Sequence, residues 1–169
     1  MAAVLCIDDI DQYRLGNLVK GVDLTRFQAS ALYTLGAVAF GKNGKEYRYV
    51  RFVDAVPYVA GHVVMLASAT QWDVTNDMSG GSALAGLWPA GVCIGVPTQN
   101  QYGWIQTKGI ATFLAGSAAI IAGDPLKPDG TTDGASDEAT AGTDENIMGV
   151  ALATVADTAT GLCMLHIRI

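Results

Sequence analysis

The residues of this chain that could carry out chemistry are few and widely spaced. Two histidines, His62 and His166, are far apart in the sequence, although they could meet in space. An imidazole becomes a candidate general base when a neighbouring group orients it, and neither histidine stands in triad or metal-ligand spacing. Nucleophile-elbow and phosphate-binding glycine motifs are also missing from the sequence. We therefore expect both histidines to be structural, and we predict no catalytic residue and no enzymatic activity.

A cluster of acidic residues offers the only hint of a metal site. Asp129, Asp133, Asp137 and Glu138 superficially resemble a calcium-binding loop. Their spacing does not match the pattern that places oxygen ligands around one ion. The acidic residues near the start, Asp8, Asp9 and Asp11, lack a rigid frame on which to converge. We predict no bound metal and no cofactor.

The cysteines and aromatic residues have structural interpretations as well. Cys6, Cys93 and Cys163 are odd in number, and no Cys-x-x-Cys occurs, so we expect reduced, mostly buried thiols. The larger aromatic side chains could line a surface that binds carbohydrate or protein, but we favour packing inside the protein or its own oligomer. This set contains Tyr47, Tyr49, Trp72, Trp88 and Trp104.

Composition predicts the fold class. The chain has 169 residues, of which half are apolar, 15% are charged and 20 are glycine. Many turns and few charges argue against a helical bundle. A chain of this length needs neither disulfides nor a metal to hold a core. We predict a mainly β protein: a compact β-sandwich or barrel-like domain with a long N-terminal arm and few short helices.

Net charge and the start of the chain bear on partners and location. The net charge of −6 repels nucleic acid and anionic membranes, so we expect neither as a partner, although solubility alone would also explain it. The first residues lack a basic region before an apolar stretch, and no apolar run is long enough to span a membrane. We expect a chain without a signal peptide that folds in a cytoplasm.

The clearest local signal is a β-hairpin. Leu35 to Phe40 is a short run of apolar and small residues, and Glu46 to Val53 returns after a turn that contains Asn43 and Gly44. Asn-Gly is typical of a hairpin because both central turn residues take positive φ. Tyr47, Tyr49 and Arg51 should lie on one face of the second strand, and Arg48, Val50 and Phe52 on the other.

Further strands follow at short spacing. We predict them at Val63–Ala67, Trp72–Thr75, Gly91–Val96, Ile147–Val155 and Leu162–Ile169. In the last of these, Cys163, Leu165, Ile167 and Ile169 should share a face, opposite His166 and Arg168.

The central stretch from Gln101 to Gly130 predicts two strand-like segments. They are separated at Ala115-Gly116-Ser117, and turns at Gly123-Asp124-Pro125 and Pro128-Asp129-Gly130 end the second. The acidic, small-residue stretch from Thr131 to Asn146 has no periodicity and predicts a solvated loop.

Residues 1–30 differ from the rest and predict an N-terminal arm, with residues 31–169 as the β-rich domain. The arm is rich in charge, and two glycines weaken its only helical pattern. It could be a docking or inter-subunit segment, or an ordinary edge strand and loop of the same domain. If it docks, we expect the contacts to come from Ile10, Tyr13, Arg14, Leu15, Leu18, Val19 and Val22.

Several of these segments carry a resemblance to a known family. They are Tyr102 to Gly109, Ala122 to Gly130, Ile147 to Ala153 and the β-rich end from Leu162 to Ile169. Together they resemble the capsid decoration, or cement, proteins of tailed bacteriophages. The similarity covers about the last eighty residues and is looser back to about Leu35. The small decoration proteins lack a counterpart to all of the arm and to parts of Gly61–Leu87.

The resemblance implies a structural virion protein on the outer capsid surface. Such a protein binds the major capsid protein and stabilises the expanded shell by bridging coat subunits. It also forms homo-oligomers, which the resemblance implies to be trimers. An alternative function is an exposed virion module that binds host-surface carbohydrate.

Overall fold

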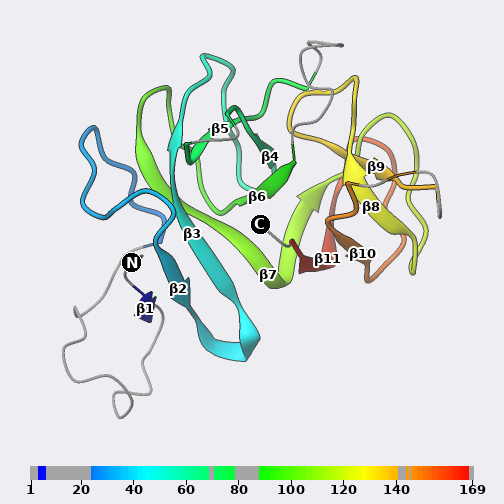
Figure 1. Cartoon of the computed structure of the whole chain (residues 1–169). Coiled ribbons are helices and arrows are strands. Elements are labelled where there is room, and N and C mark those ends of the chain that lie inside the picture. Colours follow the sequence, from blue (N-terminus) through cyan, green and yellow to red (C-terminus); the bar gives the residue numbers. More distant parts are fainter. Residues whose placement is uncertain are drawn as a thin grey trace.

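The computed structural model describes residues 4–6, 24–68, 71–78, 88–140, 144 and 146–167; side chains are described from residue 24 onward. Within these ranges almost all regular structure is β, and one short 3-10 turn, η1 (Lys42–Gly44), is the only helical element (Figure 1). The predicted mainly β class is confirmed.

In the described part of the chain, eleven strands form one continuous hydrogen-bonded sheet. Their order in the sheet is β1-β2-β3-β5-β4-β6-β7-β11-β10-β8-β9. In chain order they are β1 (Val4–Cys6), β2 (Val38–Phe40), β3 (Glu46–Phe52), β4 (Val63–Leu66), β5 (Asp73–Thr75), β6 (Pro89–Cys93), β7 (Tyr102–Leu114), β8 (Pro125–Pro128), β9 (Ser136–Glu138), β10 (Gly149–Ala151) and β11 (Thr160–His166).

Five of these strands close into a barrel. Strand β3 pairs with β5 on one side and with β7 on the other, so that β3, β5, β4, β6 and β7 form a ring. The β3–β5 pair is parallel, and the other pairs of the ring are antiparallel. Closure leaves these strands without a free edge. The barrel-like alternative among our two predicted architectures is therefore the one that forms.

Strand β7 links the barrel to a second group of strands. Its first half pairs with β3 and β6, and its second half, from Lys108 to Leu114, pairs with β11. In Figure 1 this strand curves out of the barrel toward β11, β10, β8 and β9. At the change of direction, Thr107 is an extra residue relative to β3, and Gly109 has a φ of +86°. Such bulges bend a strand, and they often lie at barrel rims.

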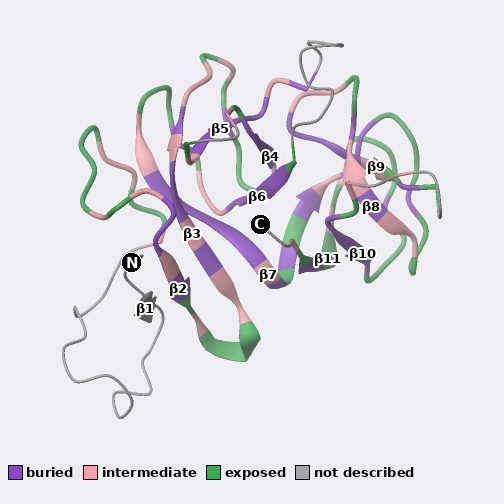
Figure 2. Ribbon diagram, viewed as in Figure 1, coloured by how far each residue is buried: buried purple, intermediate pink, exposed green. Residues whose placement is uncertain are grey.

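Buried apolar side chains form three clusters, and Figure 2 shows the buried positions following the strands. One fills the barrel, with Phe52 and Tyr58 among its largest members. A second lies under β7, β11, β10 and β8 and contains Phe113 and Met148. The third packs β2 and β3 against Trp104. The two faces of β3 therefore serve two different clusters.

The predicted hairpin is confirmed. Strands β2 and β3 pair antiparallel, and the connection contains Asn43 with φ 58° and Gly44 with φ 73°. Side chains of β3 alternate as expected: Tyr47 and Tyr49 belong to the cluster around Trp104, and Val50 and Phe52 to the barrel interior. The Asn-Gly turn fixes this register because both residues accept positive φ.

The remaining predicted strands form with shifted ends. Strands β4, β5, β6, β10 and β11 lie within or beside the predicted segments. Strand β6 begins two residues early, at Pro89, which has no N–H, and Ala90 beside it is an extra residue relative to β4. In β11 the described part of the predicted alternation holds, with Cys163 and Leu165 buried and His166 exposed.

Two predictions between residues 115 and 146 are wrong. The first strand-like segment of the central stretch forms as β7, but the second, after Ser117, is not a strand. There Ile120 makes a single two-bond bridge with Val155, and the next strand, β8, begins only at Pro125.

The stretch from Thr131 is also not purely a solvated loop. Ser136–Glu138 forms β9 on the edge of β8, and Ser136 is fully buried. The polar side chains of Ser136–Glu138 give no apolar pattern, so this strand forms because β8 is available to pair with it.

The structure describes only parts of the N-terminal arm. Val4–Cys6 forms β1, which pairs parallel with β2. Gln28 bridges to Tyr102, and the Phe27 ring packs edge-on against Phe52, with ring centroids 5.6 Å apart. The seven predicted contact residues, from Ile10 to Val22, lie outside the described residues, and the division at residue 30 stays a prediction.

Candidate interaction surface

The outer side of β7, β11 and β10 carries a row of exposed apolar side chains, which we call the apolar face. Met164 of β11 lies at the centre, directly opposite Ile110 of β7 on one side and Val150 of β10 on the other. Leu162 is the neighbouring residue of β11 on the same side of the sheet, and its carbonyl oxygen accepts a hydrogen bond from the backbone N–H of Leu152. Each of these side chains is between 40% and 49% exposed.

The inner side of the same strands is also apolar. Ala111, Phe113, Cys163 and Leu165 alternate with the exposed residues and belong to the second buried cluster. An antiparallel sheet with one solvated side normally places polar residues on that side. Apolar side chains on both sides make the outer side a candidate interaction surface.

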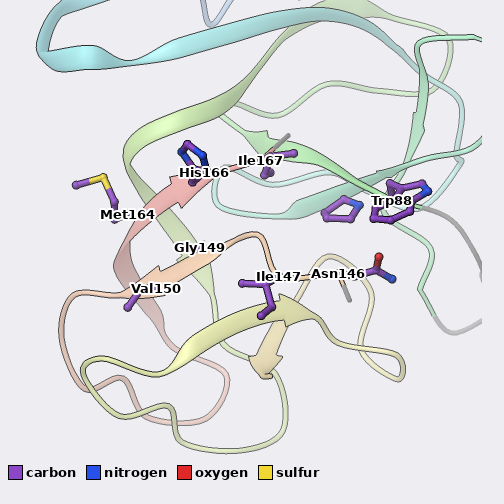
Figure 3. Close-up of a pocket in the computed structure, with 9 residues that line it drawn as sticks. Trp88, Asn146, Ile147, Gly149, Val150, Met164, His166 and Ile167 are labelled. Atoms are coloured by element: carbon purple, nitrogen blue, oxygen red, sulfur yellow. The ribbon is translucent and has the colours of Figure 1, made fainter. Parts of the chain in front are cut away.

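A groove of about 460 Å³ adjoins the apolar face (Figure 3). Trp88, just before β6, forms one side of it, and Ile147, just before β10, forms another. Met164, Val150 and the end of β11 complete a lining that is mainly apolar. Trp88 is 52% exposed, which is unusual for so large an apolar side chain and typical of a binding surface.

A second hollow of about 310 Å³ lies on the other side of the apolar face, toward the barrel. Ile110 and Leu162 line it together with Lys45 and Ala60. The apolar face and its two flanking hollows therefore form one continuous surface across β10, β11 and β7.

Charged residues lie at the two ends of this surface. Lys108 and His166 face each other across β7 and β11 at one end, next to Lys45. Lys108 also forms an ion pair with Glu46, with Nζ 2.8 Å from the carboxylate. Asp157 lies in the β10–β11 connection at the other end, and Asp124 pairs through its backbone with Ala151. Charged residues therefore lie in the elements at both ends of β11, and Glu46 offsets the charge of Lys108 at one of them.

The structure gives His62 a structural environment. Its Nδ1 lies 3.2 Å from Asn76 Nδ2, which also donates to the carbonyl of Pro57. With the Asn76 nitrogen as donor to Pro57, His62 Nδ1 is placed to accept from the same amide. Burial lowers the pKa of His62, and the nearby charge of Asp133 only partly opposes this. His166, by contrast, is exposed and lines the groove.

The acidic stretch uses its carboxylates to shape turns. Asp129 Oδ1 accepts hydrogen bonds from the backbone N–H and the hydroxyl of Thr131, at 2.8 and 2.7 Å. Burial acts to raise the pKa of Asp129, but the hydrogen bonds from Thr131 and Thr132 together lower it. Asp133 accepts from the backbone N–H of Met78. Among the described residues, no group of three or more His, Cys, Asp or Glu is arranged to hold a metal ion.

Two cysteines are buried and free, as predicted. Cys163 belongs to the second cluster, and its burial raises the pKa of its thiol to about 12. Burial raises the pKa of Cys93 as well. A thiol with such a raised pKa stays protonated and unreactive at neutral pH. The side chain of Cys6 lies outside the described part of the chain.

Most of the aromatic set packs inside the protein, as we favoured. Tyr49 and Trp104 are buried with ring centroids 5.1 Å apart, and Tyr33 packs against both. The guanidinium of Arg48 lies 4.3 Å from the ring centroid of Trp72. Trp88 is the member of the set that lies on the candidate surface. Sequence reasoning missed the apolar face itself, although apolar residues at successive positions of β11 were a signal for it.

The described ranges bear on one further question, that of membrane-spanning helices. None of the helices there is long and apolar enough to cross a bilayer.

Comparisons with known proteins add little beyond this geometry. No protein-family model matches the chain, and no curated protein matches it in sequence. Among solved structures, the chain is similar to the head fiber gp8.5 N base of bacteriophage phi29. The TM-score is 0.49 and the sequence identity 11%, over 73% of this chain and 96% of that chain. A likeness of this degree carries no inference about function.

Proposed function

We propose that this chain is a structural, non-enzymatic virion protein that binds the outer surface of a tailed-phage capsid. There it stabilises the expanded shell by bridging major capsid protein subunits. The observation that carries an assembly role is the apolar face, because a continuous apolar surface on a stable β domain is typical of a protein that binds other proteins. The phage assignment rests on the sequence resemblance.

The proposed mechanism is thermodynamic. A protein that binds the expanded shell but not its disassembled subunits stabilises that shell by mass action. If several linked copies attach together, weak individual contacts add up to a tight attachment. The resemblance implies a trimer for this oligomer.

We assign the attachment to coat subunits to residues 1–30. The described parts of this segment contact the domain: Val4–Cys6 pairs with β2, and Gln28 bridges to Tyr102. The proposed contacts are made by Ile10, Tyr13, Arg14, Leu15, Leu18, Val19 and Val22.

A non-enzymatic role fits the environments of the reactive side chains. The described cysteines are buried with raised pKa values, and His62 is occupied by Asn76. The carboxylate of Asp129 accepts hydrogen bonds from Thr131, and that of Asp133 accepts one from the backbone N–H of Met78. None of these groups is held ready to accept a proton from a substrate.

The test is binding to expanded, undecorated heads of the cognate phage. The chain is incubated with heads over a concentration series and sedimented, and the number of copies per head is measured. We expect saturable binding at a fixed ratio to coat protein. Deletion of residues 1–29 should remove binding while circular dichroism shows that the remaining β domain is still folded. Absence of binding by the folded full chain would contradict the proposal.

A second candidate function is carbohydrate binding at the groove. Trp88 presents an exposed aromatic surface, with Asn146 and His166 as polar neighbours, and such a combination can stack on a sugar and hydrogen-bond it. The largely aliphatic remainder of the lining favours a protein partner. Binding to host-surface glycans that is lost in Trp88→Ala and kept in Val96→Ala would support this alternative.

A further inference from the structure

We propose that Asn43 is a site of spontaneous covalent modification, at which its side-chain amide is converted to a carboxylate, with or without rearrangement of the main chain. The proposal goes beyond the proposed function, because it concerns the chemistry of the chain itself. It rests on the residue that follows Asn43, on the exposure of the turn, and on the close approach of this turn to the bend of β7.

The reaction needs only the chain and water. The main-chain nitrogen of Gly44 attacks the side-chain carbonyl carbon of Asn43, so that a new C–N bond forms. The proton of that nitrogen leaves with the side-chain amide as ammonia, which gives a cyclic imide. One water molecule then opens the imide. Attack at the side-chain carbonyl gives aspartate, and attack at the main-chain carbonyl gives isoaspartate, in which the main chain is one methylene longer. Asparagine is among the thermolabile residues of proteins.

The turn leaves both reacting groups accessible. Asn43 and Gly44 are exposed, and no residue of η1 is buried. Gly44 has no side chain to shield its nitrogen, and a Cβ placed on it would meet nothing within 4 Å. Ring closure requires the main chain at Asn43 to leave its φ of 58° and ψ of 30°. The hydrogen bond across the turn, from the Lys45 N–H to the carbonyl of Lys42, is 3.2 Å long. Opening of this exposed tip uncovers no buried side chain, so local opening suffices for the reaction.

Asn100 is a matched site in the same chain. Like Asn43, it is exposed and has a positive φ, of 63°. The residue that follows is Gln101, whose side chain crowds the attacking nitrogen, whereas Gly44 leaves that nitrogen open. The two sites therefore differ mainly in the residue that supplies the nucleophile.

The turn also lies against the point where β7 leaves the barrel. A Cβ on Gly109 would lie 3.2 Å from Lys45 Cα and 3.3 Å from the carbonyl oxygen of Gly44. An aspartate at position 43 keeps the length of the main chain, and aspartate tolerates positive φ. Isoaspartate lengthens the main chain in the turn that fixes the register of β2 and β3. Isoaspartate should therefore loosen the packing at Gly109, and aspartate should preserve it.

The test follows the full chain over time at elevated temperature and mildly alkaline pH. Mass spectrometry of proteolytic fragments measures conversion at each asparagine, and an isoaspartyl methyltransferase assay distinguishes isoaspartate from aspartate. We expect conversion at Asn43 to be at least about ten-fold faster than at Asn100, because Gly44 carries no Cβ. Asn43→Gln should convert far more slowly, because its longer side chain would have to close a larger ring.

Thermal unfolding then separates the two products. Chains that contain isoaspartate should unfold at a lower temperature than the fresh chain, whereas Asn43→Asp, which adds the charge alone, should unfold close to it. Equal rates at Asn43 and Asn100, or no conversion at Asn43, would overturn the proposed site. An unfolding temperature that isoaspartate leaves unchanged would overturn its link to the bend of β7. None of these measurements uses phage heads, so their failure would leave the proposed function standing.

Discussion

The side-chain amide of Gln106 donates a hydrogen bond to the carbonyl oxygen of Ile110, four residues further along the same strand, over 2.9 Å. The same nitrogen lies 3.0 Å from the carbonyl oxygen of Lys108. Gly109, between these two acceptors, has a φ of +86°. One buried side chain thus satisfies backbone carbonyls at the point where β7 leaves the barrel and begins to pair with β11. It therefore stabilises the position of the apolar face.

Gln106→Leu should destabilise the fold by about 2 kcal/mol, since carbonyls of a bulged strand lose their donor. Chemical denaturation followed by circular dichroism measures the free energy of unfolding. Gln99 also donates to a backbone carbonyl, that of Val53, but it is exposed. Gln99→Leu should therefore cost less than about 0.5 kcal/mol. Equal effects of the two substitutions would contradict the role assigned to Gln106.

Gly109→Ala should destabilise by about 2 kcal/mol, for two separate reasons. The positive φ strains any residue with a Cβ, and a Cβ there would lie 3.1 Å from Lys45 Cγ and 3.3 Å from the carbonyl oxygen of Gly44. Gly123→Ala tests the first reason alone, because its φ is +96° with open space around it. Gly130→Ala should be close to neutral, since Gly130 has neither constraint. We expect the free energy of unfolding to be highest for Gly130→Ala, intermediate for Gly123→Ala and lowest for Gly109→Ala.

Arg51 and Asp73 join the one parallel strand pair of the barrel. The guanidinium contacts both carboxylate oxygens, at 2.8 and 2.5 Å, and the Asp73 side chain is only 10% exposed. Arg51→Met should cost about 2–3 kcal/mol because it leaves a nearly buried carboxylate unpaired. Lys108→Met breaks a more exposed pair and should cost less than about 1 kcal/mol. Thermal unfolding of both variants measures the difference, and a larger loss for Lys108→Met would contradict it.

Acid should destabilise the protein through His62. Its pKa is lowered in the folded state, so the unfolded state takes up more protons once the pH falls below the unfolded value of about 6.5. This contribution to stability is complete above that pH and is lost progressively below it. His62→Gln should flatten the dependence of unfolding free energy on pH between about 6.5 and 5.

Asp54 acts in the opposite sense and must be separated from His62. Burial raises the pKa of Asp54, with repulsion from Asp77 and Asp133 adding to it, so its contribution falls as pH rises. Subtracting the unfolding free energy of His62→Gln from that of the parent chain at each pH removes the contribution of Asp54, which both proteins share. A difference that does not change with pH would show that His62 does not titrate differently on folding.

Local signals were sufficient for several elements. Asn43 and Gly44 predict the hairpin turn because their backbone geometry depends on these residue types alone. Strand β4, an uninterrupted apolar run, is buried throughout. The alternation in β11 was correct because each inward residue enters one cluster. In these cases neighbouring residues determine the structure.

Long-range pairing could not be predicted from the sequence. Closure of the barrel depends on Arg51 lying beside Asp73 in a parallel pair, and neither residue signals the other. Strand β9 forms because β8 is available as a partner. The apolar face depends on β7, β10 and β11 lying side by side, which places Met164 between Ile110 and Val150. The predicted contacts between Ile10 and Val22 stay predictions.

The most direct test of the central claim is the stability of the shell itself. Scanning calorimetry of expanded, undecorated heads gives the temperature at which the shell disrupts, with and without a saturating amount of the chain. We predict a clear upward shift that requires bound copies and that disappears when residues 1–29 are deleted. An unchanged disruption temperature at saturating occupancy would contradict a stabilising role for this protein.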